Sequence, residues 1–309
     1  MEDLLFSVAI ITYNQEKYIS QTLDSILQQR HSFKYEIVIG DDCSTDGTQE
    51  IIKKYAEKYP DIIKPIFNNP NLGIIKNYFN VINHCSGKYI MECAGDDFWL
   101  PEKVQTQIDF MEQNPEVGMC YGYAKKWLES KQCFSKKYFG SKKETMDELL
   151  EGNDIPAPTV CFRNELIKKY IDEVHPIEKG WLMEDYPEWL WFAGNSKITF
   201  IQKSLAVYRE LNDSASHILN VEKQFAFNKN YYSIQKFYAE QNYKNVYIKT
   251  DEEILFDIYY ASLLNCYTKE TRNKLITVSK IINNLGIHRC LIVLFARTYF
   301  TFCIFKILK

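Results

Sequence analysis

The sequence lacks the features that mark several broad classes of protein. Its 309 residues carry a formal net charge of only −3, which gives no case for a nucleic-acid-binding protein. No uninterrupted apolar run reaches the length of a membrane-spanning helix. The first residues, Met1-Glu2-Asp3, are acidic where a signal peptide would be basic. We therefore expect a cytoplasmic chain.

The cysteine pattern gives no indication of disulfide bonds. There are nine of them, none in a C-x-x-C pair, and several lie inside apolar runs. An odd number of such thiols is typical of reduced, buried cysteines rather than of a disulfide framework or a zinc site.

Apolar and aromatic residues, by contrast, are plentiful. Hydrophobic residues make up 46% of the chain and aromatic residues 15%, enough for a substantial core. The length suggests two domains, or one domain with an extension. Charge is unevenly spread, because residues 216–309 contain 13 Lys and Arg against 7 Asp and Glu, whereas residues 1–215 carry −9. We therefore expect a boundary near residue 215 and a separate partner for the basic tail.

Residues 1–100 alternate between strand and helix patterns. Strands are predicted at residues 5–11, 35–39, 62–67 and 89–93, and helical faces at 19–27, 51–56 and 74–82. This order predicts an α/β fold with a parallel sheet, helices on both faces and right-handed crossovers.

The pattern is less regular beyond residue 100. Pro101 is expected to open a helix that ends near Gln113. Residues 125–143 are basic and irregular, and we expect a mobile loop there. Further strands are predicted at 117–124, 158–162, 198–201 and 205–208, and helices at 145–150, at 164–171, just after residue 185 and throughout the region from about 221.

Two adjacent carboxylates, Asp96 and Asp97, follow the fourth predicted strand. Open α/β sheets bind ligands at this end of their strands. Side by side, two carboxylates repel each other unless a cation or water lies between them. A Mg²⁺ ion takes one or two carboxylates together with substrate phosphates. The alternative is a solvated turn, because Asp and Gly both favour turns.

Polar loops also follow three other predicted strands. They are Thr12-Tyr13-Asn14, the stretch from Asp41 to Gly47, and Asn71-Leu72-Gly73. Because parallel strands point the same way, these loops and the Asp96–Asp97 pair should share one edge of the sheet. That edge suits a nucleotide diphosphate with a metal ion.

These motifs resemble those of the family 2 glycosyltransferases of bacterial polysaccharide synthesis, inverting enzymes that use nucleotide sugars. The resemblance covers roughly residues 6–210 and is carried by Phe6 to Asn14, Glu36 to Thr48, Asn71 to Gly73 and Gly95 to Trp99. It implies a GT-A-type sheet and a Mg²⁺ or Mn²⁺ cofactor. It also implies a hexosyltransferase that moves sugar from a nucleotide-sugar donor, which we expect to be a UDP-sugar, to a glycan or lipid-linked acceptor.

The resemblance assigns residues 1–115 to the nucleotide sugar and 116–215 to the acceptor, with 216–309 as a helical extension. In the first half, Asp97 would be a direct metal ligand and Asp96 would contact the ribose, the diphosphate or the metal. The residues implied in nucleotide binding are Thr12, Tyr13, Asn14, Asp42, Asn71, Gly73 and Asp96, with Tyr13 stacked on the base and Asp42 hydrogen-bonded to it. In the second half, Asp185 would be the catalytic base, with Glu184 beside it.

Each assignment has an ordinary structural alternative. Tyr13 could be a core or turn residue. Asp42 could cap the next helix, although Asp46 is better placed for that. Residues 71–73 could be a plain turn, and the acids at 184–185 could cap the helix that follows them. A helix N-terminus would also favour an ionised carboxylate at these two positions, as a base requires.

Two residues, Ala94 and Leu211, depart from the family pattern. Ala94 stands where many members have an acid, which shortens the metal motif. Leu211 stands where relatives often have a histidine, and His217 is more typical of a surface histidine than of a substitute. A non-catalytic sugar-binding or scaffold protein therefore stays an alternative. A nucleotidyltransferase is a weaker alternative, because the loop at residues 12–16 is neither glycine-rich nor basic.

The last stretch, residues 290–308, is apolar almost all round and contains Arg297 and Lys306. With the basic charge before it, this stretch predicts a peripheral contact with an anionic membrane, at the inner face of the cell membrane. Arg297 argues against a true span. The alternative is that the stretch closes a core or an oligomer contact.

Overall fold

The computed structural model describes residues 4–211, 220–242, 244–265, 268–282, 289 and 292–293. The chain divides into two compact units, residues 1–214 and 215–309, and each is described here by itself. His217 and all of the 290–308 stretch except residues 292 and 293 lie outside the described residues. No helix in the described part of the chain is long and apolar enough to cross a membrane.

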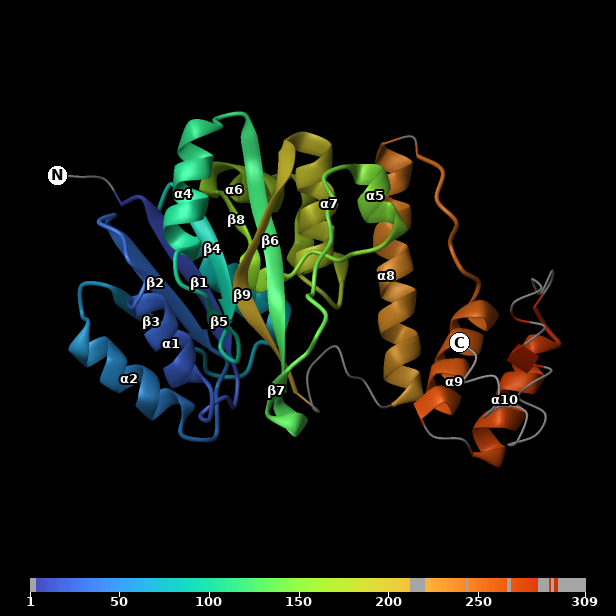
Figure 1. The fold of residues 1–309 in the computed structure, drawn as a ribbon. Helices are drawn as coiled ribbons and strands as arrows, with labels where there is room; N and C mark the ends of the chain where they lie inside the picture. The colour runs from blue at the N-terminus through green and yellow to red at the C-terminus, as the bar shows by residue number, and fades with distance from the viewer. Residues whose placement is uncertain are drawn as a thin grey trace. The chain divides into compact units, whose positions relative to one another are not determined.

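One mixed sheet organises the first unit, and within the described residues it has nine strands (Figure 1). The strands are β1 (Phe6–Thr12), β2 (Tyr35–Asp41), β3 (Ile63–Phe67), β4 (Tyr89–Ala94), β5 (Phe98–Trp99), β6 (Val117–Leu128), β7 (Cys133–Phe134), β8 (Cys161–Arg163) and β9 (Lys197–Glu210). Their order is β3-β2-β1-β4-β8-β6-β9-β5, with β7 paired to β6 outside this path.

The direction of the strands decides which loops meet. β3, β2, β1 and β4 are parallel, which confirms the prediction for the first half. β8 is antiparallel to both β4 and β6, so β6 runs in the same direction as β4. β9 is parallel to β6. The carboxyl ends of β1, β2, β4, β6 and β9 therefore lie along one edge of the sheet.

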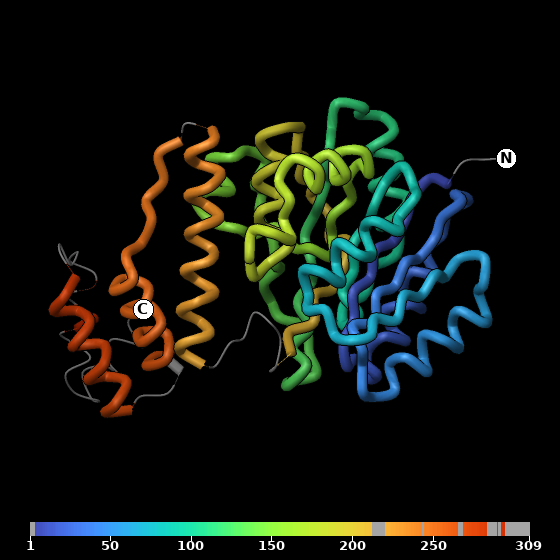
Figure 2. The backbone as a smooth tube through the Cα atoms, turned by 180° about the vertical axis from the view of Figure 1, so that it is seen from behind, coloured from blue at the N-terminus to red at the C-terminus, as the bar shows by residue number. Residues whose placement is uncertain are grey.

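Helices cover both faces of this sheet. The α-helices of the unit are α1 (Ile19–Leu27), α2 (Thr48–Lys58), α3 (Ile74–His84), α4 (Lys103–Gln113), α5 (Met146–Glu151), α6 (Asn164–Val174) and α7 (Asp185–Asn195). Short 3₁₀ turns lie at Glu129–Lys131, Ala157–Thr159 and Pro176–Lys179. Helices α1, α2 and α4 lie on the side that faces the viewer in Figure 1, and α3 and α6 on the side seen in Figure 2.

The two-residue period of the strands assigns side chains to these faces. Phe6, Val8 and Ile10 of β1 are fully buried in the core that also contains α1, α2 and α4. The intervening residue Ala9 and the β4 residue Glu92 belong to the opposite face, where Glu92 meets α3. A charged residue thus lies inside an otherwise apolar strand.

Several sequence predictions need correction. The helix expected from Pro101 begins two residues later, at Lys103, after Glu102 in the left-handed region (φ 69°). Of the strand expected at 158–162, only β8 forms, because residues 157–159 make a 3₁₀ turn with Pro158 inside it. The two closing strands are one continuous strand, β9, with irregular register against β6.

The loop expected at residues 125–143 is also partly wrong. β6 continues to Leu128, because its last residues pair with β9 as far as Glu210. β7 then folds back on β6, and the rings of Trp127 and Phe134 pack edge to face 4.9 Å apart. Aromatic contacts therefore order the first part of a segment that its composition alone marks as irregular.

The described residues of the second unit are largely helical, as predicted. Its helices are α8 (Val221–Gln241), α9 (Asp251–Asn265) and α10 (Lys269–Ser279). Phe256, Leu263 and Leu275 are among the residues of its apolar core. Arg289 pairs with Glu253 and lies 3.6 Å from a carboxylate oxygen of Asp257, which ties residue 289 to α9.

Candidate functional site

The loops after β1 and β2 are joined by hydrogen bonds. The backbone N–H of Asn14 donates to Ser44 Oγ (2.9 Å), and the N–H of Thr45 donates to Asn14 Oδ1 (2.8 Å). Asn14 has a positive φ of 52°, a conformation that asparagine adopts more readily than most residues. Next to it, the side chain of Tyr13 is 49% exposed. A large aromatic ring therefore stands open to solvent at the carboxyl edge of the sheet.

Asp42 is the point where the β2 loop and the loop before α3 meet. Its Oδ1 accepts hydrogen bonds from Asn68 Nδ2 (3.0 Å) and from the N–H of Leu72 (2.8 Å). Its Oδ2 accepts from the N–H of Gly73 (2.8 Å), and Asn71 Nδ2 donates to its carbonyl oxygen (2.7 Å). The structure thus brings three predicted residues, Asp42, Asn71 and Gly73, into one hydrogen-bonded cradle. Asp42 has no helix-capping role here.

The loop after β4 lies against the end of β1. A Cβ atom at Gly95 would lie 2.3 Å from Gln15 Oε1 and 2.6 Å from Thr12 Oγ1, so only glycine permits this approach. The close contact places Asp96 directly beside the first predicted loop. Thr12 is itself buried, and its hydroxyl donates to Gln15 Oε1 (2.7 Å).

The two aspartates face different surroundings. Asp97 is 3% exposed, and its Oδ1 accepts a hydrogen bond from the backbone N–H of Arg209 (2.8 Å). Asp96 is partly exposed, and its carbonyl oxygen accepts from Arg209 Nε (2.8 Å). Arg209 is held in turn by Glu129 (2.7 Å) and by stacking over Tyr18 at 4.7 Å. The end of β9 therefore fixes the acidic pair from one side.

Burial shapes the protonation of this pair. It raises the pKa of Asp96 above its ordinary value, against the attraction of Arg209. It raises the pKa of Asp97 well above its ordinary value, and the charge of Asp96 adds to that rise. A divalent cation would relieve both effects. Within the described residues no three His, Cys, Asp or Glu side chains converge as a complete metal site, so such an ion would need ligands from a bound substrate.

The second acidic pair lies at the start of α7. Glu184 precedes the helix and Asp185 is its first residue, and both are partly exposed. Asp185 Oδ1 accepts from the N–H of Tyr186 (2.6 Å), and the Asn153 side chain also hydrogen-bonds to this carboxylate. Burial and the charge of Asp185 raise the pKa of Glu184 to about 7, and burial raises the pKa of Asp185. Burial thus acts against the ionised form that a helix N-terminus favours at these two positions.

A buried carboxyl cluster lies one helical turn further along α7. The hydroxyl of Tyr78 on α3 contacts both Glu92 on β4 and Glu188 on α7, the latter at 2.8 Å. A hydroxyl has one proton and donates it to one acceptor, so the other contact requires a proton on one of the two carboxyl groups. Burial raises the pKa of Glu92 to about 8 and that of Glu188 well above its ordinary value. The charges of Glu184 and Asp185 raise both values further.

A buried lysine lies on the other side of β4. Lys103 Nζ donates to Gln107 Oε1 (2.6 Å) and to the carbonyl oxygen of Val160 (3.2 Å), and it lies 4.3 Å from the centroid of the Trp99 ring. Burial lowers the pKa of Lys103 to about 8, against the attraction of Glu92 and nearby thiols. This ammonium group and the carboxyl cluster therefore act on each other through the strand.

Sequence reasoning located the loops but missed their supports. Arg209, Tyr78, Glu92 and Glu188 were not predicted as site residues. A signal for two of them exists, because Glu92 and Glu188 are charged residues inside apolar runs, where charge is rarely buried without a partner. Tyr78 and Arg209 carry no such signal, because one looks like a core aromatic residue and the other like a strand-end cation.

Comparison with known sequences identifies the family. The family model described as "Glycosyl transferase family 2" matches residues 7–171. An uncharacterised protein of Mycobacterium tuberculosis is 32% identical over 209 residues, which cover 66% of this chain and 58% of that protein. TuaG of Bacillus subtilis, named as a teichuronic acid biosynthesis glycosyltransferase, is 33% identical over 120 residues, 39% of this chain and 47% of TuaG. The chain thus spans less than two thirds of these relatives.

Comparison with solved structures confirms the expected GT-A-like fold. TarS of Staphylococcus aureus, solved in complex with UDP-GlcNAc, superposes with a TM-score of 0.62 at 18% identity and covers 94% of this chain and 84% of its own. The mannosyltransferase PcManGT of Pyrobaculum calidifontis, solved with GDP-Man and Mn²⁺, has a TM-score of 0.53 at 13% identity, with coverages of 98% and 86%. At these identities the likeness establishes the fold alone.

Proposed function

Because this chain belongs to glycosyl transferase family 2, we propose that it transfers a sugar from a UDP-sugar to a hydroxyl group of a glycan or lipid-linked acceptor. The reaction inverts the anomeric carbon and serves cell-surface polysaccharide synthesis. The observation that carries the proposal is the convergence of four loops, after β1, β2, β3 and β4, on one edge of the sheet. Names among the relatives and structural neighbours point the same way, since TuaG is named for teichuronic acid and TarS was solved with UDP-GlcNAc.

The nucleotide occupies the loops after β1 and β2. Tyr13 stacks on the base, which its exposed ring permits. Asp42 takes a hydrogen bond from the base, using acceptor capacity that remains beside its three protein donors. Thr12 and Asn14 contribute from the end of β1 and the loop after it, and Asn71 and Gly73 from the loop before α3, which meets Asp42. The ordered 68–73 loop prepares the site before the donor arrives.

The acidic pair fits a Mg²⁺ or Mn²⁺ ion whose coordination is completed by the diphosphate. Two neighbouring carboxylates with raised pKa values carry charge that burial penalises and a cation would offset. When bound, the ion supplies Lewis-acid neutralisation of the leaving diphosphate. The partly exposed carboxylate of Asp96 and the second carboxylate oxygen of Asp97 would hold it. Arg209 keeps both aspartates in place through its backbone N–H and its guanidinium group.

Asp185 is the base that removes the proton of the acceptor hydroxyl. The N–H of Tyr186 and the Asn153 side chain hold its carboxylate in place, and the two carboxylate oxygens have acceptor capacity left for the acceptor hydroxyl. Burial shifts its pKa upwards, which is the direction that favours a carboxylate as a base. Glu184 hydrogen-bonds the acceptor beside it. A single in-line attack needs no covalent intermediate.

The function is tested by release of UDP from a panel of UDP-sugars, with and without Mn²⁺. The proposal predicts metal-dependent release that falls in Asp185→Asn while UDP binding is kept. Binding of UDP-sugar without release under any condition would instead favour the non-catalytic alternative that Ala94 suggests. Release of pyrophosphate rather than UDP from a nucleoside triphosphate would favour a nucleotidyltransferase.

A further inference from the structure

One segment of the first unit has a charge opposite to the rest. Residues 125–143, called here the basic arm, contain seven lysines and one acid, Glu129. Residues 1–215 carry −9 and the arm carries +6, so the remainder of that region carries −15. The net charge of the arm therefore attracts an anionic molecule, whereas the net charge of the rest of the unit repels it.

The arm starts at the edge of the sheet where the proposed donor site lies. Its first residues are the carboxyl end of β6, beside the end of β9. Glu129 of the arm pairs with Arg209 at 2.7 Å, and Arg209 donates to the carbonyl oxygen of Asp96. Only one residue, Arg209, thus separates the arm from the acidic pair.

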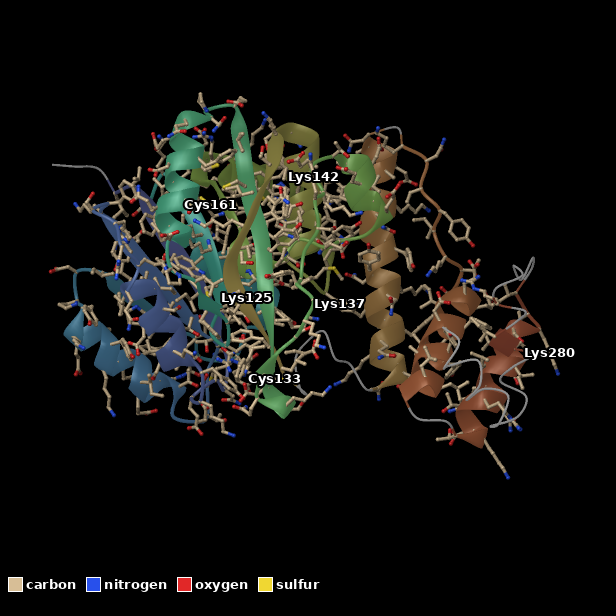
Figure 3. All side chains as sticks on the ribbon, viewed as in Figure 1. Lys125, Cys133, Lys137, Lys142, Cys161 and Lys280 are labelled. Atoms are coloured by element: carbon tan, nitrogen blue, oxygen red, sulfur yellow. The ribbon has the colours of Figure 1, made fainter. Side chains whose placement is uncertain are left out.

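Several ammonium groups of the arm are available to a ligand. Lys126 and Lys142 each pair with a glutamate at 3.0 Å. Lys131, Lys136 and Lys137 are exposed, and within the described part of the chain none of the three lies within salt-bridge distance of a carboxylate. Lys137 and Lys142 lie in the segment between β7 and α5, and Lys125 lies on β6 (Figure 3). The arm therefore offers exposed ammonium groups at Lys131, Lys136 and Lys137.

Exposed aromatic rings are interleaved with these charges. Phe134 is 50% exposed and Tyr138 is 61% exposed, although each ring packs at one side against a neighbouring ring, Trp127 or Tyr123. Lys125 Nζ lies 5.9 Å from the Phe134 ring centroid. An aromatic face offers an apolar platform to the C–H groups of a sugar ring, while the lysines beside it attract anions. Exposed aromatic rings beside lysines therefore suit a sugar polymer that itself carries negative charge.

We propose that the basic arm binds the acceptor, and that the acceptor is an anionic glycan with phosphate or carboxylate groups along its chain. The inference rests on the proposed transferase function and specifies its acceptor. A slender polymer follows the arm and ends at the donor edge, near Asp96. A flat anionic membrane would meet the acidic remainder of the unit as well, so the charge distribution favours the polymer.

The test measures binding of matched polymers to the full chain without donor or metal. The probes are neutral dextran, dextran phosphate and carboxymethyl dextran of one length, with inorganic polyphosphate as a polyanion without sugar. The proposal predicts binding of one or both charged dextrans, weakened by salt, and at least tenfold weaker binding of neutral dextran. The two charged dextrans distinguish phosphate from carboxylate as the recognised group. Equal binding of neutral and charged dextrans would overturn the proposal.

Two variants and a control locate the binding. Lys131→Gln/Lys136→Gln/Lys137→Gln should bind the preferred charged dextran roughly tenfold more weakly, as expected for the loss of three exposed charge contacts. The control Lys53→Gln/Lys54→Gln/Lys58→Gln changes net charge equally on α2, where all three lysines are exposed, and should bind as the wild type does. Equal loss in both variants would show a diffuse charge effect and overturn the assignment to the arm.

Tyr138→Ala separates a glycan site from a site for any polyanion. It should weaken binding of the charged dextran severalfold and leave binding of polyphosphate unchanged. Equal weakening of both, or tighter binding of polyphosphate or of phosphatidylglycerol vesicles than of any dextran, would overturn the glycan assignment. UDP binding by the wild type is measured in parallel. Charged dextran bound without UDP binding would contradict the donor proposal alone, and the reverse result would contradict the acceptor proposal alone.

Discussion

Two buried carboxylate environments in the first unit handle charge in opposite ways. At the donor edge, the carboxylate of Asp42 accepts three hydrogen bonds from the 68–73 loop. Below α7, Glu92 and Glu188 share the one hydroxyl of Tyr78, and Oε1 of Glu188 has no partner among the described residues. The first environment matches each acceptor with a donor, whereas the second holds more acceptors than donors.

The difference shows what each region is built to do. N–H donors fix the position of an anion, and the Asp42 cradle therefore keeps its geometry whether or not a ligand is present. Carboxyl groups short of donors must keep protons instead, so the α7 cluster responds to pH. The Asp42 cradle is thus organised by hydrogen bonds, and the cluster of Tyr78, Glu92 and Glu188 by proton sharing.

The largest expected effect on the transfer rate follows from removal of the proposed base. Asp185→Asn should lower the transfer rate by ~10² to 10⁴, the usual cost of losing a general base, while UDP still binds with metal. Glu184→Gln is the matched variant and should lose less. Transfer rates and UDP affinities of both variants provide the measurement. Near-normal transfer by Asp185→Asn, with Glu184→Gln inactive, would move the base to Glu184.

A second substitution acts on the acidic pair of Asp96 and Asp97. Asp97→Asn should abolish metal-dependent turnover, a loss of roughly a hundredfold or more, and leave the fold intact. The fold survives because the amide oxygen of asparagine still accepts the N–H of Arg209. Turnover against Mn²⁺ concentration, together with Mn²⁺ affinity in the presence of UDP, measures the effect. Asp96→Asn serves as the comparison, and normal turnover by Asp97→Asn would make Asp96 the only ligand of the pair.

A third substitution disrupts the hydrogen bonds to the carboxylate of Asp42. Asp42→Asn places an amide N–H₂ among three donors, so at least one donor loses its acceptor. The expected cost is about 1–3 kcal/mol in the free energy of unfolding, together with weaker UDP binding. Urea denaturation measures the first effect and calorimetry the second. Asp61→Asn, at an exposed position after α2, is the control and should unfold as the wild type does.

The last expected effect is a change in the pH dependence of stability, caused by the buried carboxyl cluster around Glu188. Burial raises the pKa of Glu188 well above its ordinary value, so the folded chain keeps a proton that the unfolded chain loses above about pH 4.5. That contribution to stability is complete at lower pH and is lost as pH rises towards the folded pKa. Glu188→Gln removes it, so stability should fall less steeply between pH 5 and 8, by up to about 1.4 kcal/mol for each pH unit.

Urea denaturation at three pH values across this range measures the slope. Glu165→Gln makes the same chemical change at an exposed position on α6 and should keep the steeper slope of the wild type. Parallel curves for Glu188→Gln and the wild type would show that Glu188 is ionised in the folded protein, contrary to the proton-sharing arrangement.

The strands and helices in the first half of the fold, and the positions of its loops, can be predicted from the sequence alone. Alternating strand and helix patterns predict β1 to β4 with α1 to α3, because burial on two faces leaves a clear period in the residues. Parallel strands then place Thr12, Asp42 and Asp96 along one edge without further information. The helices α8, α9 and α10 are equally local, since they follow from spacing alone.

The contacts that hold the site residues in place can be recognised only in the tertiary structure. The pairing of Glu92 with Glu188 through Tyr78 joins residues up to 110 positions apart, and no local pattern encodes such a contact. The same holds for the link from Glu129 to Arg209, and for the continuation of β6 into the basic arm, which depends on its partner β9. Local sequence records which residues are buried and with what period. Which buried groups meet depends on the crossing of distant strands and helices.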